Sequence, residues 1–171
     1  VENALAAYII SRELSIDGAS FWKALVDFKC PEHRLEKICE RDGVLFINDS
    51  KSTNPASLEV ALQSFEDKVK KIVLIAGGRD KNMDLSVVNP LISKYVKKVF
   101  SYGECRNKLS EIWKPLTSLE INDDFTTAVK AASAYADHGD VILLSPGCSS
   151  LDLFASFEER GKKFKSLVQK G

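Results

Sequence analysis

The spacing of apolar residues divides the chain into a helical start and a longer part in which strands and helices alternate. Apolar residues recur three and four positions apart in residues 3–14 and 18–28, which predicts two helices in a hairpin. By contrast, residues 72–76, Ile-Val-Leu-Ile-Ala, form a continuous apolar run. Such a run is typical of a strand that is buried on both faces of a parallel sheet.

Strand and helix patterns then follow one another from residue 35 to the end of the chain. Predicted strands cover residues 35–41, 44–48, 72–76, 98–102, 119–121 and 141–144, and predicted helices cover residues 57–65, 85–95, 105–113 and 125–136, with a final helix that carries Phe157, Phe164 and Val168. Asp42-Gly43 suits the two-residue turn of a hairpin between the first two strands. This order predicts an α/β fold with a Rossmann-like, doubly wound and mostly parallel sheet of about six strands, including one antiparallel edge strand, after a short helical segment.

A proline marks the boundary between the two parts. Pro31 removes an amide donor and biases the residue before it away from helix, so we place a linker at residues 30–34. We expect residues 1–30 to form a short helical segment and residues 31–171 to form a separate domain. The chain starts at Val1 inside a predicted helix, from which we expect a fragment or a processed chain.

Composition excludes several classes of partner. The 171 residues include 24 basic and 24 acidic side chains, so no bulk charge attracts nucleic acid or an anionic membrane. No apolar run approaches the roughly 18 residues that a membrane helix needs. The four cysteines form no CxxC pair, which favours reduced thiols over a disulfide framework or a zinc site. We therefore expect a cytoplasmic monomer with no metal site of its own, no nucleic-acid partner and no membrane partner.

Polar residues gather in three loops that follow predicted strands. These loops are Asp-Ser-Lys-Ser-Thr-Asn at 49–54, Gly-Gly-Arg-Asp-Lys at 77–81 and Ser-Pro-Gly-Cys-Ser-Ser at 145–150. In a parallel sheet all three emerge at the same edge, where α/β folds bind ligands. The loops offer two cations, Lys51 and Lys81, and several hydroxyls, and we expect a helix directly after Ser150 whose free amides favour an anion. A small molecule with two carboxylates would suit this set.

A purely structural role remains open for most of these residues. Asp49 or Asn54 could cap the next helix, Gly77-Gly78 could be an ordinary turn, and Ser149 with Asp152 resembles a capping box. Neither a cap nor a turn requires the two lysines. The chain contains no GxGxxG, GxxxxGK[ST] or GxSxG motif, so dinucleotide binding, a phosphate loop and a serine hydrolase site are all unsupported.

Taken together, these loops resemble the carboxy-terminal part of the Mur ligase family, and within it the members that add D-glutamate. The resemblance covers nearly the whole chain. Its segments are Asn-Ala-Leu-Ala-Ala at 3–7, His33-Arg34, Asn-Asp-Ser-Lys-Ser-Thr-Asn at 48–54, Gly-Gly-Arg-Asp-Lys at 77–81, Leu-Ser-Pro-Gly-Cys-Ser-Ser-Leu-Asp at 144–152 and Phe-Ala-Ser-Phe-Glu-Glu-Arg-Gly at 154–161.

The resemblance implies an ATP-dependent ligation in peptidoglycan synthesis. In the complete enzyme, ATP with Mg²⁺ phosphorylates the carboxylate of UDP-N-acetylmuramoyl-L-alanine, the amine of D-glutamate attacks the acyl phosphate, and phosphate leaves. The family binds ATP and Mg²⁺ mostly on a central ATPase domain, and the resemblance implies that residues 1–30 are the last helices of that domain and its linker, whereas the rest of it is not in this chain. The resemblance therefore implies that the chain alone is inactive.

The resemblance also assigns roles to single residues. It implies a D-glutamate site formed by Lys51, Thr53, Lys81, Ser150 and the backbone near Leu151 and Phe157, a nucleotide-facing set of Asn3, Arg34 and Asp49, and catalytic roles for Asp49 and Lys51. His33 is a weaker candidate for the nucleotide side, and Arg79 receives no role.

Two alternatives stay open at this point. The chain could be a non-catalytic module that holds an acidic metabolite or a partner protein at the same loops. It could also be the domain of a related Mur ligase or of a folylpolyglutamate synthetase, although the spacing of Lys51 and Thr53 argues against the synthetase.

Overall fold

The computed structural model describes residues 2–28, 30–65 and 67–169. It forms two compact units, the first ending at Pro31 and the second beginning at Glu32.

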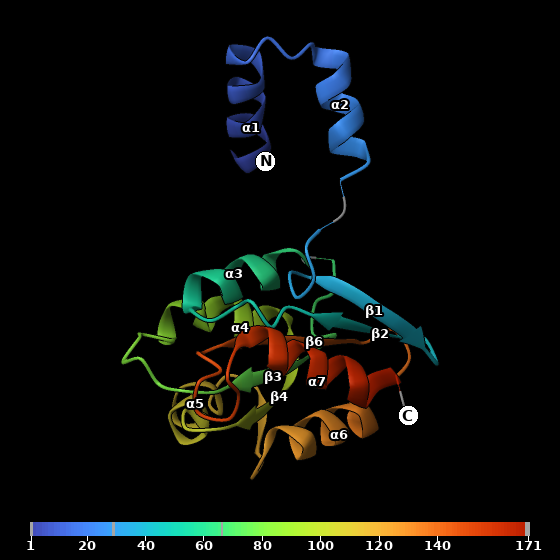
Figure 1. Ribbon diagram of the computed structural model, residues 1–171. Helices are drawn as coiled ribbons and strands as arrows, with labels where there is room; N and C mark the ends of the chain where they lie inside the picture. The colour runs from blue at the N-terminus through green and yellow to red at the C-terminus, as the bar shows by residue number, and fades with distance from the viewer. Residues whose placement is uncertain (1, 29, 66, 170–171) are drawn as a thin grey trace. The chain divides into compact units, whose positions relative to one another are not determined.

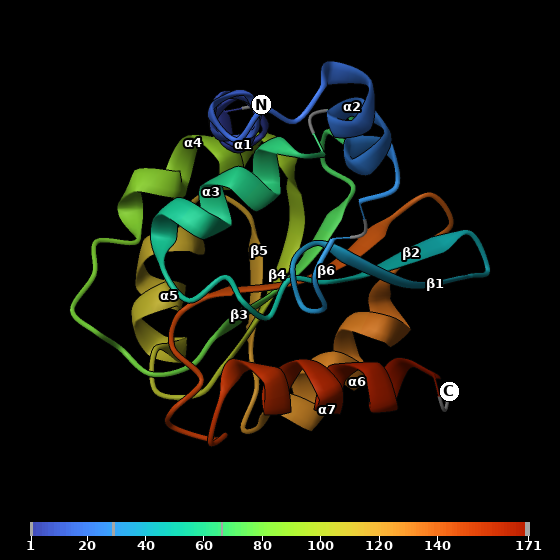
Figure 2. The same cartoon turned by 45° about the horizontal axis from the view of Figure 1, so that its top comes forward.

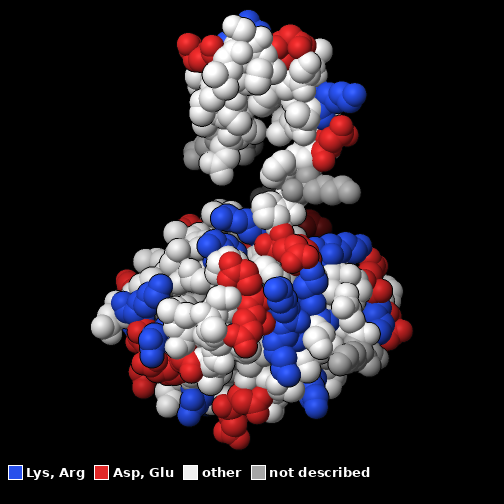
Figure 3. Space-filling view, viewed as in Figure 1, with Lys and Arg blue, Asp and Glu red and all other residues white. Residues whose placement is uncertain are grey.

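The first unit consists of two helices, α1 (Glu2–Glu13) and α2 (Gly18–Val26). Asp17 caps α2, because its carboxylate accepts a hydrogen bond from the Ser20 amide at 3.0 Å. The ring of Tyr8 packs edge-on against Phe21, with 5.1 Å between the centroids. Most described apolar side chains of this unit are nevertheless exposed, and the visible face of the unit carries few charges (Figure 3).

A six-stranded sheet is the centre of the second unit. Its strands, in chain order, are β1 (Glu36–Arg41), β2 (Val44–Asn48), β3 (Ile72–Gly77), β4 (Val96–Tyr102), β5 (Ser118–Ile121) and β6 (Val141–Gly147). Across the sheet the order is β1-β2-β6-β3-β4-β5, with β1 antiparallel to β2 and all other neighbours parallel. The predicted mostly parallel fold with one antiparallel edge strand is confirmed.

Helices cover both faces of this sheet (Figures 1 and 2). They are α3 (Pro55–Gln63), a short 3₁₀ turn η1 (Ser86–Val88), α4 (Asn89–Tyr95), α5 (Arg106–Trp113), α6 (Phe125–Tyr135) and α7 (Phe157–Gln169). Helices α3 to α5 share one apolar core with residues such as Leu74 and Leu143, whereas α6 and α7 share the other with Ile75 and Leu144. Alternate residues of β3 and β6 thus enter opposite cores, which explains their continuous apolar sequences.

Local sequence accounts for several boundaries. Asp42 and Gly43 both have positive φ, 51° and 73°, as a tight hairpin turn with the twist of its strands requires. Asn54 caps α3 by accepting the Ser57 amide at 2.9 Å, and Pro55 occupies the first turn, where its missing amide costs nothing.

Two expected helices differ from the structure. The helix expected at 85–95 is divided into η1 and α4, because Pro90 cannot donate a backbone hydrogen bond to a continuous helix and instead starts a new one. The expectation that a helix follows Ser150 directly is wrong. Residues 151–153 form a turn closed by the Phe154 amide on the Ser150 carbonyl at 2.9 Å, and α7 begins only at Phe157.

The topology places the loops of interest side by side. After β2 the chain crosses to β3, and it returns from α6 to form β6 between these two strands. The carboxyl ends of β2, β6 and β3 are therefore neighbours at one edge of the sheet, which is the switch point where α/β folds bind ligands. No helix among the described residues is long and apolar enough to cross a membrane.

Candidate functional site

The three polar loops contact one another at this edge, as the sequence predicts. The Gly147 amide, at the end of β6, donates to the Ser52 carbonyl in the loop after β2 at 3.1 Å. The Arg79 amide, in the loop after β3, donates to the Ser149 carbonyl in the loop after β6 at 2.8 Å. The loop after β6 thus bridges the other two.

The double glycine at the end of β3 makes one of these contacts possible. Gly78 has a φ of +129°, and a Cβ atom added there would lie 2.1 Å from the Ser149 carbonyl oxygen. At Gly77, with a φ of +135°, an added Cβ would lie 2.0 Å from the Tyr102 carbonyl oxygen. Only glycine permits both the backbone conformation and this close approach, so Gly77-Gly78 is more than an ordinary turn.

Asp49 lies at the base of the site and is 7% exposed. One carboxylate oxygen accepts the Ser145 hydroxyl at 2.8 Å, and the other accepts the Leu35 amide at 3.2 Å. Burial raises the pKa of Asp49 to about 6, although these hydrogen bonds and the charges of Arg34 and Arg160 act in the opposite direction. Asn54, and not Asp49, caps α3. Helix capping therefore does not explain why the Asp49 carboxylate is buried here.

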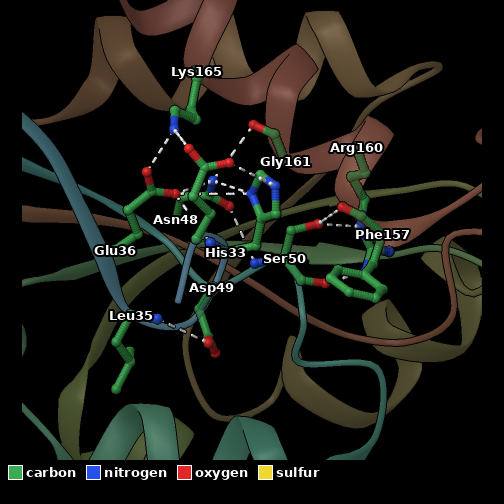
Figure 4. A network of polar contacts seen from close by, with 11 residues as sticks. His33, Leu35, Glu36, Asn48, Asp49, Ser50, Phe157, Arg160, Gly161 and Lys165 are labelled. Carbon is green, nitrogen blue, oxygen red and sulfur yellow. Dashed lines mark hydrogen bonds and ion pairs between the residues drawn. The ribbon is translucent and has the colours of Figure 1, made fainter. Parts of the chain in front are cut away.

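Arg160 in α7 joins two of the loops, and the sequence analysis did not single it out. Its side chain is fully buried. Nε donates to the Ser50 hydroxyl at 3.0 Å, and one terminal nitrogen donates to the Ser50 carbonyl at 2.8 Å (Figure 4). The other terminal nitrogen donates to the Cys148 carbonyl at 3.2 Å. A signal was present in the sequence, because Arg160 falls on the apolar stripe of α7 with Phe164 and Val168.

His33 belongs to the wall of the site and is 3% exposed. Asn48 donates from Nδ2 to His33 Nδ1 at 2.9 Å and to a Glu36 oxygen at 3.1 Å, while its Oδ1 accepts the Ser50 amide at 3.2 Å. Because the amide nitrogen of Asn48 can only donate, His33 Nδ1 is the acceptor in this hydrogen bond. Lys165 closes this network through an ion pair with Glu36 (Figure 4).

The structure places the residues assigned to D-glutamate at the loop ends and the start of α7. Lys51 and Thr53 are half-buried after β2, Ser150 is buried after β6, and Leu151 is 52% exposed. Lys81 is exposed after β3 and has no hydrogen bond or ion pair within the described ranges. The neighbouring Asp80 fixes the loop by pairing with Lys108 at 3.0 Å.

The nucleotide-facing candidates are only partly brought together. Arg34 is exposed and close enough to influence Asp49 electrostatically. Asn3 is exposed on α1 in the first unit, so it has no defined position relative to the loops. The capping box expected for Ser149 and Asp152 does not form, because Asp152 accepts the Glu104 amide at 3.1 Å instead.

Arg79 forms a long ion pair with Glu104 at 3.7 Å, and both side chains are about half exposed. Within the described residues, no three His, Cys, Asp or Glu side chains gather to hold a metal ion.

Solved structures share this fold at low sequence identity. MurF from Acinetobacter baumannii aligns with 100% of this chain and 38% of its own, with a TM-score of 0.74 and 15% identity. A pseudomurein peptide ligase type C from Methanothermus fervidus aligns with 98% of this chain and 35% of its own, with a TM-score of 0.70 and 20% identity. At such identities the likeness shows the fold.

Sequence relatives are closer. The chain is 42% identical over 167 residues to the UDP-N-acetylmuramoylalanine–D-glutamate ligase of Chlamydia caviae, which covers 97% of this chain and 39% of the relative. It is 38% identical over 169 residues to the ligase of the same name from Aquifex aeolicus, which covers 99% of this chain and 40% of the relative. The chain thus spans about two fifths of the length of these relatives.

A family model matches the segment that contains the first two loops and the start of the third. The model, described as "Mur ligase, glutamate ligase domain", matches residues 33–148, from the buried histidine to the loop after β6. The match spans most of the chain and agrees with the sheet order and the convergence of the three loops. The chain belongs to the Mur ligase family and carries its glutamate ligase domain.

Proposed function

We propose that the second unit binds D-glutamate within a longer ATP-dependent ligase that joins D-glutamate to UDP-N-acetylmuramoyl-L-alanine. Relatives that carry this activity in their names support the proposal. The observation that carries it is the convergence of the loops after β2, β6 and β3, because these loops carry the residues that suit a dicarboxylic amino acid.

The chemistry of the loops matches the ligand. Lys51 and Lys81 supply one cation each for the two carboxylates of D-glutamate, and Thr53 and Ser150 supply hydroxyl donors. The backbone near Leu151 and Phe157 adds amide groups. ATP, when bound, converts the acceptor carboxylate into an acyl phosphate, a far better electrophile. The residues of this chain then hold the amine of D-glutamate in position for attack.

Asp49 and Arg34 face the nucleotide in this proposal. Above its pKa of about 6, Asp49 is charged and has lone pairs left to accept hydrogen bonds from ribose hydroxyls. We further propose that the first unit, with Asn3, is the end of the ATP-binding domain. Its exposed apolar side chains, such as Ile9 and Phe28, support this assignment because such surfaces favour contact with other protein.

Substrate preference tests the reaction. The full-length protein should release phosphate from ATP in the presence of UDP-N-acetylmuramoyl-L-alanine and D-glutamate, and mass spectrometry should identify the amide product. L-glutamate, glycine and diaminopimelate serve as competitors for the same site. Preference for any of these three over D-glutamate would refute the proposed function.

Lysine variants test the site. Lys51→Ala and Lys81→Ala should each raise the KM for D-glutamate, because a lost charged hydrogen bond costs about 1.5–3 kcal/mol. Lys37→Ala is the matched control, since Lys37 is an exposed lysine of the same unit that pairs only with Glu40 at the surface. Unchanged kinetics in both site variants would refute the assignment of these lysines.

A further inference from the structure

The ammonium of Lys51 lies on an aromatic ring. Its Nζ is 3.9 Å from the centroid of the Phe157 ring, well within the range of a cation–π contact. Among the described residues, no carboxylate forms an ion pair with Lys51. The side chain is half-buried, so this contact is partly shielded from water.

The backbone holds the same two residues together. The hydroxyl of Ser50, which precedes Lys51, donates to the Phe157 carbonyl at 2.8 Å. The amide of Lys51 donates to the His33 carbonyl at 3.0 Å. Both ends of the cation–π pair are therefore anchored, one at the loop after β2 and the other at the first residue of α7.

His33 supports the ring from its edge. The two rings pack in a T-shaped arrangement with 6.2 Å between their centroids. The hydrogen bond from Asn48 fixes His33 in this orientation (Figure 4). Gly161, one turn after Phe157 on α7, leaves the required space, because a Cβ there would lie 2.2 Å from His33 Nδ1. His33 thus acts here as a support for Phe157, in addition to any contact with a nucleotide.

Glu158 is the acidic neighbour of this arrangement. The Ser156 hydroxyl is the largest cause that lowers the pKa of Glu158, and the charges of Lys51 and His33 contribute less. Glu158 is half-buried and forms no ion pair with Lys51 among the described residues, whereas the ring of Phe157 is held in place by the edge contact with His33. The ring is therefore the group that defines where Lys51 rests.

We propose that Phe157 is a positioning residue, whose ring holds the Lys51 ammonium ready for a carboxylate of the incoming amino acid. This inference rests on the proposed function. A long lysine side chain loses rotamer freedom when it binds a ligand, and a ring that already restricts it lowers that cost. Phe157 therefore contributes to amino-acid binding through its side chain as well as through its backbone.

Kinetics of the full-length ligase test the role of the ring. Phe157→Leu keeps an apolar side chain but removes the π face, and should raise the KM for D-glutamate by roughly 3- to 30-fold, as loss of a cation–π contact predicts. Phe157→Tyr retains the face and should remain within about threefold of the wild type. The KM for ATP should stay constant in both, whereas general damage to the site would change all parameters together.

Proton NMR of the present chain tests the contact without any activity. The ring current of Phe157 should shift the ε-methylene protons of Lys51 upfield in the wild type and in Phe157→Tyr. The shift should disappear in Phe157→Leu and in Phe157→Met, which provides a second variant if the first folds poorly. Unshifted Lys51 protons in the wild type would overturn the proposal.

The two experiments separate the possible failures. If the wild-type enzyme does not use D-glutamate, the proposed function fails, whatever the NMR result. If the enzyme is active and the shift is present but Phe157→Leu leaves the KM for D-glutamate unchanged, the positioning role alone fails.

Discussion

The loops after β2 and β3 each carry a lysine that we assign to the same ligand, but the structure holds the two loops differently. Around the first loop, side chains from within the fold fix the backbone, since Arg160 binds both the hydroxyl and the carbonyl of Ser50. Lys51 itself rests on the Phe157 ring. In the second loop the backbone is fixed by two glycines, of which Gly77 approaches Tyr102 and Gly78 approaches Ser149, and Lys81 is exposed.

This difference suggests that the two lysines have different roles in binding the ligand. A lysine that is held before binding loses little freedom when the ligand arrives, whereas an exposed lysine can adjust to the ligand at a higher entropic cost. We expect Lys51 to set the position of the amino acid and Lys81 to close over it.

Removing the guanidinium that holds the first loop should have the largest effect. Arg160→Met leaves the buried carbonyls of Ser50 and Cys148 without a donor, and we expect a loss of about 3–5 kcal/mol in the free energy of unfolding. Urea denaturation measures this loss. Arg79→Met is the control, because the half-exposed Arg79 has only a long surface ion pair and should cost less than about 0.5 kcal/mol. Equal effects of the two variants would contradict the internal role of Arg160.

A methyl group at Gly78 should disturb the second loop almost as much. Gly78→Ala combines a disallowed φ with a clash against the Ser149 carbonyl, and should cost about 2–4 kcal/mol. Gly139→Ala separates the two causes, because Gly139 also has a positive φ, +87°, but an added Cβ meets nothing within 4 Å. We expect the control to cost only about 1–2 kcal/mol, the backbone part of the effect. Thermal unfolding of both variants gives the comparison.

Asp49 gives the first loop a dependence on pH. Its folded pKa of about 6 lies above the ordinary aspartate value of 3.8, so the folded state holds the proton more tightly than the unfolded chain does. The resulting stability is fully present below pH 4 and is lost as the pH rises through 6. At pH 8 the folded state must bury a charged carboxylate, and Asp49→Asn removes that cost. The variant should therefore be more stable than the wild type by about 1–3 kcal/mol at pH 8 and hardly at all at pH 4. A gain that is independent of pH would contradict the raised pKa.

Removing either lysine side chain should cause the smallest change in the free energy of unfolding. Lys51→Ala should cost about 0.5–1 kcal/mol, because it removes the cation–π contact with Phe157. Lys81→Ala should change the free energy of unfolding by less than about 0.5 kcal/mol, since Lys81 is exposed and has no partner in the described parts of the chain. Chemical denaturation of both variants without ligand measures these two changes. Equal losses in the free energy of unfolding would contradict the conclusion that the fold holds Lys51 and leaves Lys81 free.

Much of the fold follows from short-range patterns in the sequence. The apolar run at residues 72–76 predicts a buried strand, and β3 (Ile72–Gly77) is buried along its whole length. Asp42-Gly43 predicts the hairpin turn, and both residues have the positive φ that such a turn needs. The pattern was misleading at Ser150, where a turn stands in place of a helix start.

The candidate site could be predicted from the sequence only in part. The lysines and hydroxyls are visible in the sequence because they follow predicted strands, and their convergence follows from the rules for parallel sheets. Arg160 and His33 were not assigned their roles. Arg160 meets Ser50 across 110 positions of the chain, and Gly161 gives His33 its space across a similar distance. Propensity and periodicity carry no information about such pairs.

The sequence by itself determined the order of strands and helices, the hairpin turn, and the chemical types of the residues at the strand ends. These features depend on backbone sterics and on apolar spacing within a few residues. Only the tertiary structure decided which groups are buried together, including Arg160 beneath the loops, Asp49 with its raised pKa, and Lys51 on the ring of Phe157. Burial and close contact depend on segments that the sheet brings together from distant parts of the chain, so they arise only when the whole domain has folded.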